Sequence, residues 1–501
     1  MYPQMNTRRL QKYLIVFGAG LAAVFSFAPF SLFPLAVLAL SLLFWQWQQA
    51  DDKWQSAWLG FVFGLGLFTG VMGWIYIALH DYGDMSFLPA LAASALFISV
   101  LAVLPTFAGL AVARIKTDGW TRTVLVMPAL WVLLEWLRGL LFTGFPWLAM
   151  GYSQISASPL TGYAPVLGVY GVSLAVALSA GLLVVAWQAK WRKQRSMALL
   201  ALVLLWGSGA VLRIVEWTKP AGEPISVALV QGNIPQELKF REEKLVTTLE
   251  NYRRLVMQSN AKLIVLPETA LPVLREELPQ NYLQILGNHA RNNGGDLLIG
   301  AFERDQGRYY NSVFTLGTAA SQSYRKNHLV PFGEFIPLRP LLGWFINEVL
   351  HIPMSDLARG GDRQQVLHVA GQRVAVQICY EDVFGEEVIR YLPEASLLVN
   401  VSNDAWYGKS HAAIQHNQIS QMRALESGRM MLRATNTGVT SIIDRNGTIT
   451  QMLPQHVEGT LTGLAQGYVG STPYVSWSNW GILVLAVLML TAAVLLQRKE
   501  A

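Results

Sequence analysis

The stretch VAVQICYED, residues 374–382, is an apolar and partly β-branched run that ends in a thiol followed by two carboxylates. A short apolar run of this kind predicts a buried strand. The polar residues at its end place Cys379 where the strand turns into a loop, so that the side chain can face a cleft. Cys379 is the only cysteine among 501 residues. A lone cysteine is either a small buried hydrophobic residue or a reactive thiol, and the rest of the sequence has to decide between the two.

The composition of the whole chain indicates a membrane protein. Hydrophobic residues make up 52% of it and charged residues only 14%, which is too apolar for an ordinary soluble protein. The single cysteine excludes an internal disulfide framework and a cysteine-rich metal site. Although the net charge is +6, the basic residues lie in short loops and form no stripe of the kind that binds nucleic acid.

Apolar stretches of bilayer-crossing length, about 20 residues each, recur along the chain. They lie at roughly 11–29, 32–49, 55–79, 87–114, 121–143, 164–188, 196–214 and 479–497. The first resembles a signal peptide, but cleavage after Ala28 would leave Pro29 at the new terminus and further spans follow at once. We therefore expect an α-helical bundle of about eight spans.

The short loops predict the orientation of these spans, because lysine and arginine favour the cytoplasmic side. The alternate loops 29–32, 80–86 and 144–163 contain neither residue. The basic residues lie at the other ends of the spans: Arg8, Arg9, Lys12, Lys53, Arg114, Lys116, Arg122, Lys190, Arg192, Lys193, Arg195, Arg498 and Lys499. We expect both termini in the cytoplasm and the segment between the last two spans on the outer side of the membrane.

Three regions follow from this pattern. Residues 1–214 are expected to form a seven-helix transmembrane domain, 215–478 an extracytoplasmic globular domain, and 479–501 a last transmembrane helix with a short cytoplasmic tail. The middle region alternates short strands with amphipathic helices, which is typical of an α/β layered domain. The expected strands are 225–231, 262–266, 296–301, 311–317, 374–379, 396–402 and a hairpin of 440–444 with 448–452 around a type I′ turn at Asn446-Gly447; the expected helices are 237–259, 277–293 and 412–431.

Two further segments supply partners for a reactive thiol, which needs a base or a cation beside it at neutral pH. The apolar strand that ends in Leu266-Pro267-Glu268 delivers a carboxylate, and we expect it at the rim of the same sheet that carries Cys379. Glu268 is the candidate general base, with a capping or surface role as its alternative. Lys326 stands before an apolar strand and is the candidate cation for the thiolate and for an oxyanion, with an ordinary surface role equally open.

Glu268, Lys326 and Cys379, in this order and in these contexts, resemble the catalytic triad of the nitrilase superfamily. Further motifs share the likeness: CYED at 379–382, NVSNDAW at 400–406 and VQGNIPQ at 230–236. Together with the apolar spans and the segment GFPW at 144–147, the chain resembles the membrane-integrated apolipoprotein N-acyltransferase family along essentially its whole length.

The resemblance implies an αββα sandwich for the catalytic domain and a two-step acyl transfer. Cys379 would take an acyl chain from a phospholipid, usually phosphatidylethanolamine, as a thioester. The α-amine of the N-terminal diacylglyceryl-cysteine of an apolipoprotein would then take it as an amide. Glu268 would act as the base and Lys326 would stabilise the oxyanion, without any metal or other cofactor.

The same resemblance implies supporting residues. Glu334 matches an additional carboxylate that would orient Lys326 or the incoming amine. Tyr380 and Glu381 flank the nucleophile, and the backbone amide of Tyr380 is a candidate oxyanion donor.

Two regions are candidate contacts for lipid. Glu135 and Arg138 are three residues apart on one face of the fifth span, where either a mutual ion pair or a lipid headgroup would account for them. The apolar segment 341–354 is too short to span a bilayer. It forms either a core helix or a lid that dips into the membrane surface, with Trp344, Phe345 and Leu350 as its apolar contacts.

Other functions remain possible from the sequence. A membrane-tethered nitrilase-type amidase would use the same triad, but a tether needs one helix and not seven. A transporter with an external binding domain would show broken spans in matched halves, and the chain shows no such symmetry. His411 and His416 lack the spacing of a zinc motif, so no metal site is expected.

Overall fold

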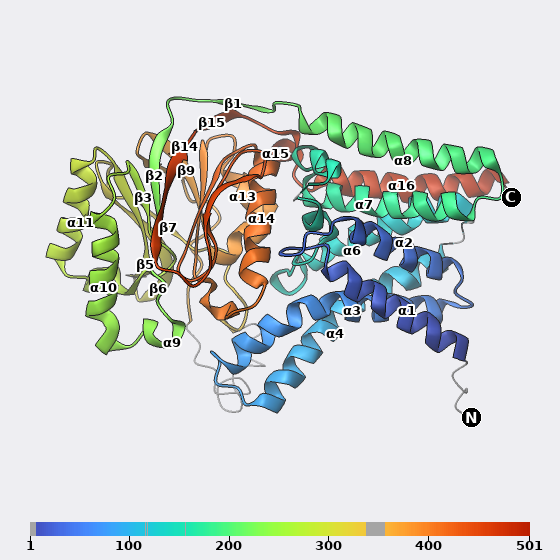
Figure 1. Ribbon diagram of the computed structural model, residues 1–501, viewed down its shortest axis with the longest axis horizontal. Coiled ribbons are helices and arrows are strands. Elements are labelled where there is room, and N and C mark those ends of the chain that lie inside the picture. Colours follow the sequence, from blue (N-terminus) through green and yellow to red (C-terminus); the bar gives the residue numbers. More distant parts are fainter. Residues whose placement is uncertain (1–6, 116, 118, 156, 337–355, 501) are drawn as a thin grey trace. The chain divides into compact units, whose positions relative to one another are not determined.

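The computed structural model of the chain describes residues 7–115, 117, 119–155, 157–336 and 356–500. These residues form two compact units (Figure 1). One, the helical unit, comprises the residues up to Tyr76, Leu88–Val215 and the residues from Ser476 onward. The other, the sandwich unit, comprises Ile77–Phe87 and Glu216–Val475.

Helices lie at each of the eight apolar stretches that the sequence predicts. They are α1 (Thr7–Val24), α2 (Pro34–Gln48), α3 (Lys53–His80), α4 (Phe87–Arg114), α5 (Gly119–Thr121) continued by η1 (Arg122–Val126) and α6 (Met127–Arg138), η4 (Pro159–Tyr163) continued by α7 (Ala164–Gln188), α8 (Arg192–Arg213) and α16 (Trp480–Glu500). Within the described residues, six of these segments are long and apolar enough to cross a membrane, and Pro34–Gln48 is a shorter apolar helix. The chain is therefore a membrane protein, while the count of eight spans stays a prediction.

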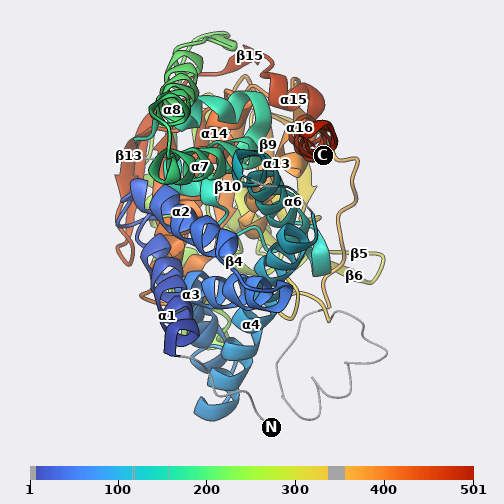
Figure 2. The same cartoon turned by 90° about the vertical axis from the view of Figure 1, so that its right-hand side faces the viewer.

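Small residues let these helices pack closely. A Cβ built on Gly20 of α1 would overlap the carbonyl oxygen of Phe63 in α3, and one built on Gly66 of α3 would overlap that of Phe17. Such close backbone approach supplies contact energy where lipid replaces water as the solvent. Further along the bundle, α2 packs beside α7, and α7 beside α8 (Figure 2).

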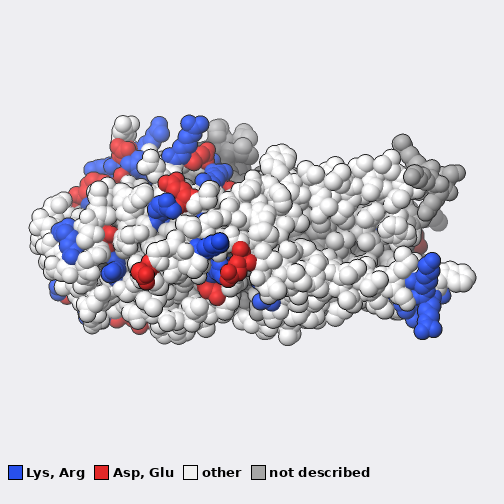
Figure 3. Space-filling view, turned by 90° about the horizontal axis from the view of Figure 1, so that it is seen from above, with Lys and Arg blue, Asp and Glu red and all other residues white. Residues whose placement is uncertain are grey.

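The surface of the helical unit carries few charges. Figure 3 shows that its visible face is almost free of acidic and basic side chains, except at the end where α8 begins. The sequence there contains Lys190, Arg192, Lys193 and Arg195. A wide uncharged band with a basic end is what a lipid environment requires of a helical bundle.

Two β-sheets form the centre of the sandwich unit. One has the strand order β14-β2-β3-β5-β6-β7, with β4 beside β5, and the other has the order β13-β12-β11-β10-β9-β8. The strands of the first are β2 (Ile225–Gln231), β3 (Leu263–Val265), β4 (Leu271–Leu274), β5 (Asp296–Asp305), β6 (Arg308–Gly317), β7 (Ser323–Arg325) and β14 (Gly459–Ala465). Those of the second are β8 (Leu367–Val369), β9 (Gln372–Ile378), β10 (Leu397–Ser402), β11 (Met431–Thr435), β12 (Thr440–Ile443) and β13 (Ile449–Leu453). A short pair, β1 (Thr218–Pro220) and β15 (Tyr468–Gly470), stands apart.

Apolar residues fill three layers of this unit. Leu229 and Val265 of the first sheet pack against Val376 and Val399 of the second to form the central core. Helices α10 (Glu242–Met257) and α11 (Gln280–Asn292) cover the outer face of the first sheet. On the outer face of the second lie α13 (Gly385–Val388) and α14 (Ala412–Ser427) (Figure 1). This is the expected αββα sandwich.

Two helix predictions are wrong at their ends. The helix expected over 237–259 is split into α9 (Gln236–Lys239) and α10, because Arg241 has an extended backbone. The helix expected to reach residue 431 ends at Ser427, where Gly428 adopts the left-handed conformation with φ 62°. The chain then enters β11, a strand inside the second sheet that the sequence reading missed.

The predicted hairpin of β12 and β13 is present, but its turn is of another type. Gly447 has φ 78° and its amide donates to the carbonyl of Asp444 over 3.0 Å. Asn446 keeps a negative φ, whereas a type I′ turn needs positive values at both central residues. The connection is therefore a type I turn followed by a glycine bulge.

Candidate active site

The three triad candidates come from the ends of three strands of the sandwich unit. Glu268 follows β3 and Lys326 follows β7, both in the first sheet, while Cys379 follows β9 in the second. The expectation that Glu268 and Cys379 share one sheet is therefore wrong. Lys326 also follows a short strand and does not precede one. The site lies where the ends of two packed sheets meet, which brings together side chains far apart in sequence.

Cys379 occupies a strained turn between a strand and a helix. Strand β9 ends at Ile378, and the 3₁₀ helix η7 (Cys379–Val383) begins at the next residue. Cys379 has φ 54°, a left-handed conformation that costs a non-glycine residue about 1–3 kcal/mol. Asn400 of β10 holds this turn by donating a hydrogen bond from Nδ2 to the Cys379 carbonyl over 3.0 Å. The sequence prediction that Cys379 ends a strand at a turn is confirmed.

Glu268 is buried, and both of its oxygens accept hydrogen bonds. Oε1 accepts from Asn311 Nδ2 over 2.7 Å, and Oε2 accepts from the backbone amide of Asn403 over 2.8 Å. Lys326 Nζ lies 3.4 Å from Oε1. These donors hold the carboxylate ionised and in one orientation, as a base requires.

Lys326 lies between two carboxylates. Its side chain is 1% exposed, and Nζ is 2.8 Å from Glu334 Oε1 as well as 3.4 Å from Glu268 Oε1. The other oxygen of Glu334 accepts from the backbone amide of Val330 over 2.8 Å. Glu334 therefore orients Lys326, one of the two roles expected for it.

The charges of these groups set their protonation states. Burial opposes the charge of Lys326, but Glu334 and Glu268 raise its pKa well above the ordinary range. Burial likewise opposes ionisation of Glu268, but Lys326 and Lys239 lower its pKa. Burial and the Glu268 charge raise the pKa of the Cys379 thiol far above its ordinary value, which Lys326 only partly offsets. The resting site is thus a neutral thiol beside a carboxylate and an ammonium.

Glu381 connects the two strand ends that carry Lys326 and Cys379. Its Oε1 accepts from the backbone amides of Asn327 and His328 over 2.7 and 3.1 Å. Its Oε2 accepts from that of Ile378 over 2.7 Å. Tyr380 is buried beside it, with its ring 5.2 Å from that of Phe384. Glu381 is a positioning residue that fixes the distance between two parts of the site.

We expect Glu381→Gln to destabilise the sandwich unit by about 1–3 kcal/mol, since an amide NH₂ would face a buried backbone donor. Burial raises the pKa of Glu381 to about 7 although backbone amides lower it, so thermal unfolding should be measured at pH 8, where the carboxylate is ionised. Glu387→Gln is the control, because Glu387 is partly exposed and bonds the ring of His328. Equal unfolding temperatures for Glu381→Gln and the control would contradict this role.

Three residues of the site were given no role by the sequence analysis, although Asn403 lies in the motif at 400–406. Asn311 and Asn403 hold Glu268 as described. Lys239, at the end of α9, is 2% exposed, and its Nζ donates to the Glu268 carbonyl over 3.1 Å. Burial lowers the pKa of Lys239 to about 7, although the nearby Glu268 and Cys379 charges oppose this shift. A lysine in the predicted amphipathic helix 237–259 is expected at the surface. Its burial becomes apparent only from the structure, in which that helix is interrupted directly after Lys239.

Glu135 and Arg138 belong to the helical unit and bind its own backbone. Glu135 Oε1 accepts from Trp131 Nε1 and from the backbone amide of Met150, each over 2.9 Å. Arg138 donates to the carbonyls of Phe145 and Trp147. These bonds fix the segment after α6, and a lipid headgroup contact stays a prediction. Residues Trp344, Phe345 and Leu350, predicted as lipid contacts, lie outside the described residues.

Comparison with known proteins finds matches over both units. A family model described as the apolipoprotein N-acyltransferase N-terminal domain matches residues 19–182. A second, described as carbon-nitrogen hydrolase, matches residues 226–474. The apolipoprotein N-acyltransferase of Nitrosomonas europaea is 52% identical over 96% of this chain and 96% of its own length.

The chain belongs to the apolipoprotein N-acyltransferase family. The enzyme of that name from Methylococcus capsulatus is 44% identical over 94% of this chain and 93% of its own. The chain is thus an N-acyltransferase enzyme with a nitrilase-like catalytic unit. The amidase and transporter hypotheses are set aside, because the likeness to apolipoprotein N-acyltransferases extends through the helical unit as well as the sandwich unit.

Proposed function

We propose that the enzyme moves an acyl chain from a phospholipid, with phosphatidylethanolamine as the usual donor, to the α-amine of the N-terminal diacylglyceryl-cysteine of an apolipoprotein. The reaction passes through a thioester on Cys379. The observation that carries the proposal is the strained Cys379 turn beside an ionised Glu268 and an enclosed Lys326.

In the first step, the Cys379 sulfur attacks the ester carbonyl of the phospholipid while Glu268 takes the thiol proton. Proton loss and attack occur together, because the free thiolate is costly in this site. The ester carbon-oxygen bond breaks, the glycerol oxygen takes the proton back from Glu268, and a lysophospholipid leaves. Lys326 and the Tyr380 amide stabilise the oxyanion, and such a donor is worth about 3 kcal/mol.

In the second step, the lipoprotein amine attacks the thioester carbonyl and Glu268 takes a proton from the amine. The carbon-sulfur bond breaks, and the proton returns to the sulfur as the amide forms. A thioester suits this exchange because it reacts readily with amines, and the two-step course lets two bulky lipids use one site in turn.

Lys326→Arg is expected to lower thioester formation by about 100-fold or more, close to the loss in Lys326→Ala, because one oxyanion contact is worth that much. A planar guanidinium does not replace a compact ammonium held between two carboxylates. The rate is measured by intact mass after mixing with phospholipid vesicles, with Lys262→Arg as the exposed control. A largely active Lys326→Arg variant would show that any distant positive charge suffices.

We also propose that residues 1–214 and 479–501 contribute eight spans of the bacterial inner membrane, with both termini in the cytoplasm and 215–478 in the periplasm. The distribution of lysine and arginine among the loops supports this topology. Because Cys379 is the only cysteine, single cysteines placed in loops 80–86 and 190–195 of a Cys379→Ala chain can be labelled from either side. Labelling of both loops from one side would contradict it.

The two-step course is tested by loading the enzyme with phospholipid, removing the excess, and then adding a diacylglyceryl-cysteine peptide. We expect one equivalent of N-acylated peptide and the return of the free thiol. A peptide that is acylated only while phospholipid is present would exclude the stored thioester.

A further inference from the structure

A cluster of buried ionisable side chains lies directly behind Cys379, and the mechanism above does not use it. His416 of α14 places Nε2 2.8 Å from Asp382 Oδ1 and Nδ1 3.1 Å from Asp404 Oδ1. Arg433 of β11 bonds the same two carboxylates, at 3.3 Å from Asp382 Oδ2 and 2.9 Å from Asp404 Oδ2. The four side chains are 0% exposed. We name them the charge cluster.

The charge cluster ties four separate parts of the chain together. Asp382 lies in η7, three residues after Cys379, and Asp404 begins the 3₁₀ helix η9 (Asp404–Tyr407) after β10. His416 projects from the covering helix, and Arg433 from the strand beside β10. Displacement of any one of these elements would therefore strain the others.

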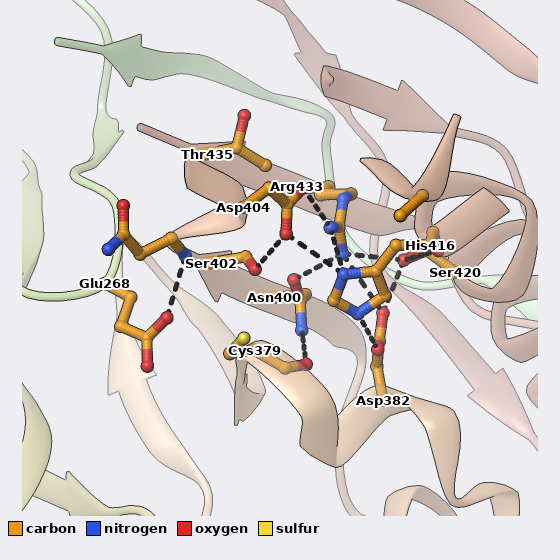
Figure 4. A network of polar contacts seen from close by, with 12 residues as sticks. Glu268, Cys379, Asp382, Asn400, Ser402, Asp404, His416, Ser420, Arg433 and Thr435 are labelled. Carbon is orange, nitrogen blue, oxygen red and sulfur yellow. Dashed lines mark hydrogen bonds and ion pairs between the residues drawn. The ribbon is translucent and has the colours of Figure 1, made fainter. Parts of the chain in front are cut away.

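Hydrogen bonds lead from the charge cluster to Cys379 through Asn400 (Figure 4). Arg433 Nη1 donates to Asn400 Oδ1 over 2.7 Å, and Asn400 Nδ2 donates to the Cys379 carbonyl over 3.0 Å. Ser402, which also lies beside the Cys379 thiol, donates its hydroxyl proton to Asp404 Oδ1 over 2.7 Å. The left-handed backbone of Cys379 is thus held at its carbonyl by a bond that leads back to the charge cluster.

The charges of the cluster balance when His416 is protonated, with two carboxylates against one guanidinium and one imidazolium. Burial and Arg433 oppose the imidazolium, but Asp382 and Asp404 together raise the pKa of His416. The ring of Tyr407 lies 6.2 Å from the ring of His416 and adds no charge to the cluster. In the neutral state Nδ1 can instead accept from Arg433 Nη2, 2.8 Å away. Loss of the His416 proton would leave a net negative charge behind the thiol.

We propose that His416 is a positioning residue for the nucleophile. Through Asp382, and through Arg433 and Asn400, it keeps Cys379 in its strained attacking conformation. Its positive charge also offsets the carboxylates of the charge cluster, so that no net negative charge lies behind the sulfur. The inference rests on the proposed role of Cys379 as nucleophile. It adds to that role a buried support made of residues that never touch the substrate.

His416→Leu in the full-length enzyme is expected to lower the first-order rate of thioester formation by about 10- to 100-fold, since misplacing reacting atoms by about 1 Å costs up to 100-fold. The KM for phospholipid vesicles should stay within about twofold, because the cluster is buried away from the lipid. His416→Gln keeps a donor to Asp382 but not the positive charge, so it should restore only part of the rate. In His416→Leu, alkylation of Cys379 by iodoacetamide should shift to higher pH, because the two carboxylates lose the imidazolium.

Asn400→Ala is the second variant, and it keeps the proposal testable if His416→Leu fails to fold. It cuts the link to the Cys379 carbonyl and leaves the charge cluster itself in place, so we expect a similar loss of rate. Ser441→Ala is the matched control. It removes a 2.6 Å buried hydrogen bond between β12 and Asn417 of the same helix α14, but it does not touch the cluster.

All rates are expressed per reactive thiol, so that a smaller folded fraction does not count as slower chemistry. Equal rates in wild type and Asn400→Ala, or an equal loss in Ser441→Ala, would overturn the proposal, because the cluster would then serve stability alone. An unacylated wild-type Cys379 would instead refute the proposed function, before any variant is compared.

Discussion

Cys379→Ser is expected to lose thioester-type acylation and turnover by about four orders of magnitude or more, the scale on which loss of a nucleophile acts. The substitution is nearly isosteric, so the fold and the left-handed turn at this residue are retained. The loss is chemical: a hydroxyl is far harder to deprotonate than a thiol, and Glu268 is a weak base held ionised by Lys326. Turnover is measured with phospholipid vesicles and a diacylglyceryl-cysteine peptide.

The control for this variant is thermal unfolding, which should be unchanged. Near-normal turnover by Cys379→Ser would refute the nucleophile assignment. Cys379→Ala gives the baseline for any acylation elsewhere on the chain.

Glu268→Gln is expected to slow both half-reactions by about 100- to 10,000-fold, the range that general base catalysis supplies. An amide does not accept the thiol proton in the first step or the amine proton in the second. Whichever way the glutamine amide is turned, its NH₂ group also faces a donor, since the Asn311 side chain and the Asn403 backbone amide each donate to one oxygen of the carboxylate. Each half-reaction is followed separately by mass, first with phospholipid alone and then with peptide added to preloaded enzyme.

Glu458→Gln serves as the control, because Glu458 pairs with Arg254 at the exposed surface. Acylation of Cys379 at the normal rate in Glu268→Gln would place the base elsewhere. Loss of only the second half-reaction would give Glu268 a role toward the amine alone.

The sequence predicted the strands that deliver Cys379 and Glu268, because each is an apolar run that stops at a polar residue. It did not predict that the two strands belong to different sheets, since strand order depends on packing between distant segments. Strand β11 was missed because a covering helix runs directly into it, with only Gly428 marking the boundary. The eight apolar helices were easier to locate, because length and hydropathy alone identify them.

The support around the triad was harder to anticipate. Lys239, Asn311 and Asn403 act through single contacts with Glu268, and no spacing in the sequence connects them. His416 was considered only as a metal ligand, although its partners Asp382 and Asp404 lie in the motifs that defined the resemblance. Such residues are recognised only when the fold brings their side chains within hydrogen-bond distance.

Intact-mass analysis of the purified enzyme after incubation with phospholipid alone tests the central claim most directly. A thioester on Cys379 predicts one added acyl chain, removed by neutral hydroxylamine and absent in Cys379→Ala. An enzyme that gains no acyl mass, or that keeps it after hydroxylamine or in Cys379→Ala, would contradict the thioester on Cys379.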